Sequence, residues 1–120
     1  MDTQRRPVIG ISMGDPGGIG PEICAKALAQ KEIYDLCRPL VVGDADIMAD
    51  AVRFSKLALG VAARQKVSEA AFRLGEIDVF DLKRLELADL RHKQVTAGQG
   101  RASFEYIAKV IALAMAGEID

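Results

Sequence analysis

A glycine-rich loop near the start of the chain constrains the fold more than any other feature. It has the sequence MGDPGGIGPE at residues 13–22 and follows an apolar run at 8–13. Its glycines allow positive φ angles and a close approach of a ligand to the backbone. The free N–H groups of a helix that begins at Pro21 favour an anion beside the loop. The order strand, glycine loop, helix is typical of α/β enzymes, which place a ligand cleft at this point.

The rest of the chain alternates between short apolar strands and helices. We predict strands at 7–13, 40–43, 59–63 and 77–80, helices at 21–31, 47–57 and 103–115, and a helical turn at 68–74. The end of the first helix is left open between residues 31 and 34. Nearly continuous apolar strands that alternate with helices indicate a mostly parallel sheet covered on both faces. The sequence therefore predicts an α/β fold without an internal domain boundary.

Helix caps and one helix face can be predicted from individual residues. Asp44 and Asp46 offer a carboxylate cap for the helix at 47–57, and Ser68 one for the turn at 68–74. Glu105 and Lys109 are spaced to form a pair on the polar side of the helix at 103–115, which we expect to end at Gly117. The opposite side has residues at helical spacing and is predicted to be buried. These residues are Phe104, Ile107, Ala108, Ile111, Ala114 and Met115. Val110 and Leu113 widen this face, so we expect the helix to be buried on more than one side.

Composition excludes several classes of partner. The chain has 16 basic and 17 acidic residues and a net charge of −1, so it lacks the basic surface that nucleic acids or anionic membranes attract. Aromatic residues make up 5% and tryptophan is absent, which argues against a base-stacking surface. The start of the chain, residues 1–6, is polar, and no apolar run is long enough for a signal peptide or a membrane span. We therefore expect a cytoplasmic protein.

Residues of potential chemical interest have ordinary structural interpretations. Cys24 and Cys37 do not form a CxxC pair and are expected to be buried, reduced thiols. His92 is the only histidine; it lies in the charged segment 83–93, and we expect it to be solvated rather than a metal ligand. Thr96 is predicted to be a cap or turn residue. Solvated charges are expected at three carboxylates: Glu76, Asp78 and Asp81.

Two common phosphate-binding motifs do not fit the glycine loop. A P-loop requires a Gly-Lys-Ser/Thr ending that the chain lacks, so a kinase or other phosphotransferase is disfavoured. A Rossmann fingerprint requires GxGxxG, but the residues after Gly20 are Pro21-Glu22-Ile23. From the residues alone, the loop either contacts a ligand or is a tight turn whose glycines serve only geometry. The chain is accordingly either part of an enzyme or a non-catalytic α/β binding module.

Three segments carry a family resemblance. The loop at 13–22 resembles the N-terminal signature of the 4-hydroxythreonine-4-phosphate dehydrogenase family, although Gly17 stands at or near a position where the family usually has alanine. LVVGD at 40–44 and VTAGQGRASFEYI at 95–107 are similar to the family in the same order, whereas 55–93 match poorly. The family is similar in fold to the isocitrate and isopropylmalate dehydrogenases, a three-layer α/β/α sandwich. The resemblance therefore implies that residues 1–120 are the N-terminal portion, about a third, of a larger two-domain enzyme.

The resemblance also implies a reaction. Family members oxidise a phosphorylated hydroxy acid with NAD or NADP and decarboxylate the product with the help of a divalent metal, Zn, Mg, Co or Mn. The expected substrate is 4-phosphooxy-L-threonine of vitamin B6 (pyridoxine) biosynthesis. The alternative is D-threonate or D-erythronate 4-phosphate of sugar acid catabolism. A homodimer is expected, and neither membrane nor nucleic acid is an expected partner.

Asp15, Gly18 and Ile19 are the cofactor-binding residues that the resemblance transfers to this chain. Gly18 and Ile19 match a loop that lies near the cofactor in isopropylmalate dehydrogenase-like enzymes. Asp15 is the polar residue of the loop, and it either orients the loop or contacts the ligand. Family catalytic residues and metal ligands fall after residue 120, so none is expected within 1–120.

Overall fold

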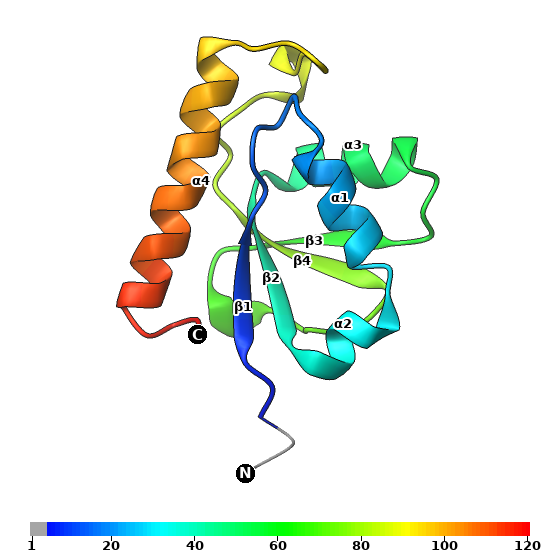
Figure 1. Cartoon of the computed structure of the whole chain (residues 1–120), viewed down its shortest axis with the longest axis vertical. Helices are drawn as coiled ribbons and strands as arrows, with labels where there is room; N and C mark the ends of the chain where they lie inside the picture. The colour runs from blue at the N-terminus through cyan, green and yellow to red at the C-terminus, as the bar shows by residue number, and fades with distance from the viewer. Residues whose placement is uncertain (1–4) are drawn as a thin grey trace.

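The computed structural model describes residues 5–120, so part of the polar start of the chain, residues 1–4, lies outside the described residues. Within residues 5–120, four parallel strands form one sheet in the order β1-β2-β4-β3 (Figure 1). Their bounds are Val8–Ser12 for β1, Arg38–Gly43 for β2, Gly60–Arg64 for β3 and Glu76–Asp81 for β4. All three strand pairings are parallel, which confirms the predicted parallel sheet.

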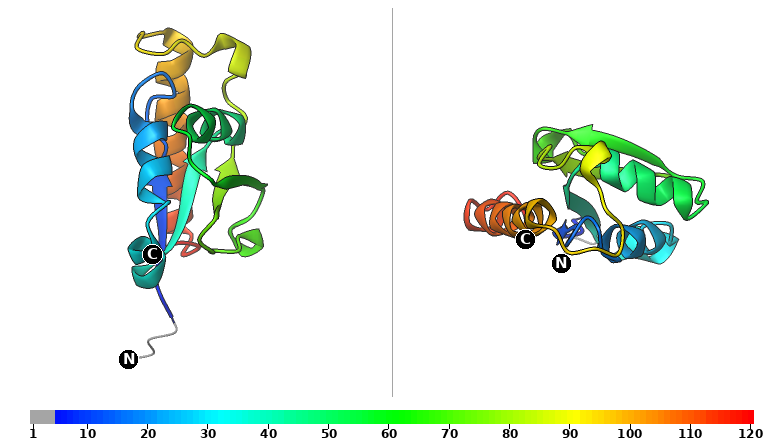
Figure 2. Two further views of the ribbon diagram at one scale, coloured as in Figure 1. Left: turned by 90° about the vertical axis from the view of Figure 1, so that its right-hand side faces the viewer. Right: turned by 90° about the horizontal axis from the view of Figure 1, so that it is seen from above.

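Helices cover both faces of the sheet. α1 (Gly20–Ala27) and α3 (Ala45–Phe54) pack against each other, and α4 (Ala97–Met115) contacts β1 and β2. Figure 2 shows α4 on one side of β1 and α1 on the other. A further helix, α2, spans Lys31–Leu36, and short 3-10 turns span Val67–Glu69 and Leu87–Asp89. The predicted α/β fold, with helices on both sides of the sheet, is confirmed.

Alternate residues of the central strands face opposite cores. Val41 and Val79 are paired in register and pack with residues of α1 and α3. Val42 packs on the other face with Leu113 of α4 and with Ile119. All three valines are fully buried. Such strands carry continuous apolar runs because both faces of a parallel sheet are covered.

The first predicted helix is in fact two helices. α1 ends at Ala27 and α2 begins at Lys31. The N–H of Leu28 still donates to the Cys24 carbonyl, as in a helix. The Leu28 side chain is buried in the core. Gln30 then has an extended backbone, with φ −94° and ψ 123°, so the helix cannot continue through it. The prediction of one helix over 21–31 was wrong because the periodic pattern of the sequence does not reveal this turn.

α4 begins earlier than predicted, at Ala97 instead of residue 103, and is capped by Thr96. The Thr96 Oγ1 accepts a hydrogen bond from the Gln99 N–H at 3.2 Å, as a helix cap does. Gly117, with φ 76°, follows the helix as predicted. The Glu118 N–H donates to the Leu113 carbonyl, which completes the left-handed helix ending.

The predicted buried face of α4 was wrong for its main stripe, although Leu113, which was predicted to widen that face, is buried. Phe104, Ile111 and Met115 are 71%, 57% and 84% exposed, and Ile107 is also exposed. The residues that α4 does bury are Gln99, Ala102, Tyr106 and Leu113. Both sets follow helical spacing, because the helix is apolar on more than one side. The sheet selects the second set, whose small Ala102 allows close packing.

The predicted pair between Glu105 and Lys109 was also wrong. Glu105 Oε2 lies 2.8 Å from Arg84 Nε, and Lys109 Nζ lies 5.1 Å from the centroid of the Phe80 ring. Both partners lie in the segment 80–84, which contains the end of β4 and the residues just after it. Tertiary neighbours replace a weak pair within the helix because the segment 80–84 runs beside it.

Asp78 is buried, which contradicts its predicted solvation. Its side chain is 1% exposed and lies 2.8 Å from Arg64 Nε. Its carboxylate also accepts the N–H groups of Ala71 and Phe72, at 3.1 and 2.8 Å. These donors lie in the chain between β3 and β4, so the carboxylate holds that connection onto the sheet. Glu76 is exposed, as predicted.

Ser68 does not cap a helical turn. The turn spans Val67–Glu69, so Ser68 lies inside it. The Glu69 carboxylate accepts the N–H groups of Gln65 and Lys66 at 2.8 and 3.1 Å. The predicted turn at 68–74 is thus confirmed only near its start, and its capping residue was wrong.

Both cysteines are free thiols, as predicted, but only Cys24 is buried; Cys37 is partly exposed. Burial raises the pKa of the Cys24 thiol. None of the helices in the described chain has the length and apolar character needed to cross a membrane.

Candidate functional site

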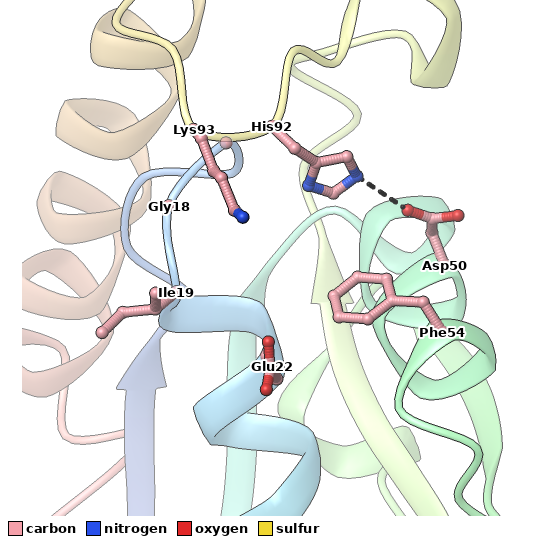
Figure 3. A pocket seen from close by; sticks show the side chains of 8 residues that line it. Gly18, Ile19, Glu22, Asp50, Phe54, His92 and Lys93 are labelled. Atoms are coloured by element: carbon pink, nitrogen blue, oxygen red, sulfur yellow. Dashed lines mark ion pairs between the residues drawn. The ribbon is translucent and has the colours of Figure 1, made fainter.

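A cavity of about 540 Å³ lies between the glycine loop, α3 and the segment before α4 (Figure 3). Its lining residues come from three separate stretches of chain: Gly17, Gly18, Ile19, Glu22, Asp50, Phe54, His92 and Lys93. The glycine loop follows β1 directly, so the cavity lies at the carboxyl end of that strand. This is the position at which parallel α/β sheets bind ligands.

The glycine loop forms one wall of the cavity through Gly18 and Ile19, two of the three predicted cofactor-binding residues. Asp15, the third, does not line the cavity. Its Oδ1 accepts the Gly17 N–H at 2.8 Å, and its carbonyl accepts the Gly18 N–H at 3.0 Å. The side chain of Asp15 therefore holds the loop in shape, one of the two roles considered for it. Ile19 is 71% exposed and free to contact a ligand.

The segment that contains His92 and Lys93 forms the second wall. The Lys93 N–H donates to the Gly17 carbonyl at 2.8 Å, so this segment is bonded to the glycine loop. Lys93 has φ 61°, a left-handed conformation that costs energy for a residue with a side chain. Its side chain extends from the loop toward Glu22 and Ile19 (Figure 3). A cationic group is thereby held at the mouth of the cavity.

α3 supplies the third wall through Asp50 and Phe54. His92 Nε2 lies 3.4 Å from Asp50 Oδ2. The His92 ring meets the Phe54 ring edge to face, with centroids 5.6 Å apart and an interplanar angle of 86°. The His92 side chain is half exposed, so it is partly solvated, as predicted, but it also contacts α3. The cavity thus joins the apolar surfaces of Ile19 and Phe54 to two acidic and two basic side chains.

Sequence reasoning missed this wall. No spacing or motif links residues 18, 54 and 92, and only the packing of α1 beside α3 brings them together. Glu22, predicted in the first turn of its helix, lines the cavity and pairs with Lys26. Among the described residues that line the cavity, none is a serine, threonine or cysteine nucleophile. The arrangement is suited to binding an organic ligand with apolar and charged parts.

Asp44 anchors the segment that follows β4, although it was predicted to cap a helix. It precedes α3, but its side chain makes no cap bond. The carboxylate is buried and accepts the N–H groups of Arg84 and Leu85, at 2.8 and 2.9 Å. It also accepts the Tyr106 hydroxyl at 2.7 Å. Burial and this hydrogen bond raise the pKa of Tyr106 far above its usual range. Hydrogen bonds from three residues that are distant in sequence therefore replace the predicted helix cap.

The described residues, 5–120, contain no candidate metal site. Among residues 5–120, no group of three or more histidine, cysteine, aspartate or glutamate side chains is arranged to hold an ion. The acidic side chains Asp44 and Asp81 instead accept backbone N–H groups. No metal-dependent step is therefore assigned to the described residues.

Comparison with known proteins gives a consistent set of relatives. The family described as "Pyridoxal phosphate biosynthetic protein PdxA" matches residues 35–120. A protein of Symbiobacterium thermophilum, with the provisional name D-threonate 4-phosphate dehydrogenase, is 46% identical over 120 residues, which are 100% of this chain and 35% of the relative. A Clostridium botulinum protein with the same provisional name is 40% identical over 115 residues, 96% of this chain and 34% of the relative.

Solved structures agree with the sequence matches. A crystal structure of a 4-hydroxythreonine-4-phosphate dehydrogenase from Burkholderia phymatum has a TM-score of 0.93 and 39% identity, over 97% of this chain and 35% of that one. The enzyme of the same name from Klebsiella pneumoniae has a TM-score of 0.86 and 30% identity, over 95% of this chain and 34% of that one. The chain thus spans about a third of the length of the relatives it matches.

Proposed function

Because this chain belongs to the family of the pyridoxal phosphate biosynthetic protein PdxA, we propose that it is part of an NAD- or NADP-dependent dehydrogenase of phosphorylated hydroxy acids. Its relatives are dehydrogenases by name, which supports an oxidoreductase. The observation that carries the proposal is the family match over residues 35–120, together with a cavity beside the glycine loop.

We propose 4-phosphooxy-L-threonine as the substrate, oxidised and then decarboxylated. The names of the solved relatives from Burkholderia phymatum and Klebsiella pneumoniae support this choice. D-threonate 4-phosphate is the second candidate, since curated relatives at 40% and 46% identity carry its name, and D-erythronate 4-phosphate is of the same class. All three are four-carbon acids with a phosphate at one end and a hydroxyl to oxidise.

We propose that the cavity beside the glycine loop holds part of the dinucleotide. NAD or NADP, when bound, supplies the hydride acceptor of the reaction. The residues present suit such a group: Ile19 and Phe54 offer apolar surface to a flat ring, and Lys93 offers a positive charge to a phosphate. Asp15 shapes the loop, and Gly18, which has no side chain, allows the ligand to approach the backbone closely.

The remaining parts of such an enzyme are proposed to lie beyond residue 120. They are the catalytic residues, the ligands of a divalent metal (Zn, Mg, Co or Mn) and the second domain. The proposed active form is a homodimer. The described residues would then contribute one wall of the cofactor site and the sheet that supports it.

The substrate proposal can be tested with the full-length protein. Each of the three phosphorylated acids is incubated with NAD or NADP and a divalent metal, and absorbance of the reduced nicotinamide is followed. We expect turnover with at least one acid, and a higher kcat/KM for 4-phosphooxy-L-threonine than for the two sugar acid phosphates. A higher value for D-threonate 4-phosphate would select the second candidate. Absence of nicotinamide reduction with every acid would contradict the dehydrogenase proposal and favour a non-catalytic binding module.

A further inference from the structure

We propose that Gln99 is a positioning residue for the cavity, because its side chain sets the segment 91–94 against the glycine loop. This segment carries His92 and Lys93, which form one wall. The inference rests on the proposed function in one respect: that the cavity binds the dinucleotide. Gln99 itself does not line the cavity and touches no proposed ligand.

The Gln99 side chain is fully buried and uses both ends of its amide on the same segment. Its Oε1 accepts the Arg91 N–H at 2.7 Å, and its Nε2 donates to the Gln94 carbonyl at 2.9 Å. The two bonds span His92 and Lys93, so these residues are held between two fixed backbone points. A buried amide with both ends satisfied fixes geometry, because either end left unpaired would cost energy.

The same side chain packs against the other wall. A Cβ atom at Gly17 would collide with Gln99 Nε2 and would lie 2.5 Å from the Arg91 carbonyl oxygen. The Lys93 N–H, in addition, donates to the Gly17 carbonyl at 2.8 Å. Gln99 therefore contacts both the glycine loop and the segment 91–94, and the distance between these two walls depends on it.

The backbone of Gln99 is itself fixed. Its N–H donates to the Oγ1 of Thr96, the cap of α4, so the side chain starts from the first turn of a long helix. This rigid origin lets the amide hold Lys93 in its left-handed conformation, which an unsupported loop would leave. A binding wall built on a helix in this way is pre-organised before the ligand arrives.

Two substitutions in the full-length protein test the role. Gln99→Leu and Gln99→Met each keep a similar volume and remove both hydrogen bonds, and the unbranched methionine follows the shape of glutamine more closely. Gln94→Leu is the matched control, since it makes the same replacement in an exposed side chain and retains the backbone carbonyl that Gln99 uses. Amide hydrogen exchange of residues 91–94 and steady-state kinetics are measured for each variant.

For Gln99→Leu we expect faster exchange at 91–94 and a KM for the dinucleotide raised about tenfold, with kcat changed less than about twofold. Gln99→Met should show the same changes, and Gln94→Leu should match the wild type. Unchanged exchange in Gln99→Leu would overturn the positioning role. Faster exchange with an unchanged KM would also overturn it, and would show that the dinucleotide binds elsewhere. If Gln99→Leu is partly unfolded, Gln99→Met decides: faster exchange at 91–94 with a raised KM for the dinucleotide supports the positioning role, and wild-type exchange or a wild-type KM overturns it.

Discussion

Asp44, Asp78 and Gln99 are buried polar side chains that each hold distant backbone in place. Between them they accept or donate hydrogen bonds to residues of the 71–72, 84–85 and 91–94 segments. The carboxylates of Asp44 and Asp78 accept backbone N–H groups, which stabilise their buried charge, whereas the Gln99 amide accepts one N–H and donates to one carbonyl. These segments are therefore held by individual polar groups, of which Asp78 was predicted to be solvated and Asp44 to be a helix cap.

Among the described residues, Tyr34 and Ser55 have buried side-chain oxygens without a hydrogen-bond partner, and Tyr34 leads to a pH-dependent prediction. Its hydroxyl has no hydrogen-bond partner among the described residues. Burial, followed by the charge of Asp78, raises its pKa from 10.0 to about 12. Between these values the unfolded chain has lost the proton and the folded chain retains it. The free energy of unfolding therefore falls as the pH rises through this window, and the contribution of Tyr34 is fully present below pH 10.0.

We expect Tyr34→Phe to reduce this pH dependence. The variant should change the free energy of unfolding by less than about 1 kcal/mol at neutral pH, because the lost hydroxyl is unpaired. Above the ordinary tyrosine pKa the variant should lose less stability than the wild type. Urea unfolding of both chains at a series of pH values measures the difference. Parallel curves for the two proteins at alkaline pH would contradict the raised pKa.

At the scale of elements, α4 shows that sequence periodicity predicts the presence of a helix better than it predicts which face is buried. Its existence and its end at Gly117 were predicted, because a helix ending is local chemistry. Thr96 was predicted only to be a cap or turn residue, and the start of the helix at Ala97 was not predicted. Nor was its buried face, because the helix carries two apolar stripes of equal spacing. The choice between them depends on Tyr106, whose hydroxyl reaches Asp44 at the end of β2.

A matched pair of alanine substitutions tests this orientation of α4. Leu113→Ala should lower the free energy of unfolding by about 2–5 kcal/mol, since it opens a cavity against the sheet. Phe104→Ala should change it by less than about 0.5 kcal/mol, because the ring is mostly solvated. Chemical denaturation of the 120-residue chain measures both. A larger effect for Phe104 than for Leu113 would mean that the helix packs through its other face.

At the scale of the whole molecule, the sheet gathers the ends of distant segments at one edge. The loop after β1, the helix after β2 and the segment before α4 meet around one cavity. Parallel strands make this possible, because every crossover returns the chain to the same edge.

The 120-residue chain alone is predicted to be inactive as a dehydrogenase. Its described residues contain a binding cavity but no group of side chains arranged to hold a metal ion. Assays of the isolated chain with NAD, NADP, divalent metals and the three phosphorylated acids should give no reduced nicotinamide, while the full-length protein serves as the positive control. Turnover by the isolated chain would refute the assignment of catalytic residues beyond residue 120.

The sequence by itself determined the parallel α/β fold, the strand–loop–helix unit at residues 13–22 and the C-terminal end of α4. These features follow from apolar runs, glycines and caps that act within a few residues of one another. Only the tertiary structure decided which face of α4 is buried. It also decided that Asp44 binds distant backbone instead of capping a helix, and that Asp78 is buried instead of solvated. The position of His92 and Phe54 around the same cavity as the glycine loop is likewise a tertiary outcome. These outcomes depend on partners that are remote in sequence, and a local pattern contains no information about a contact that forms only when the sheet assembles.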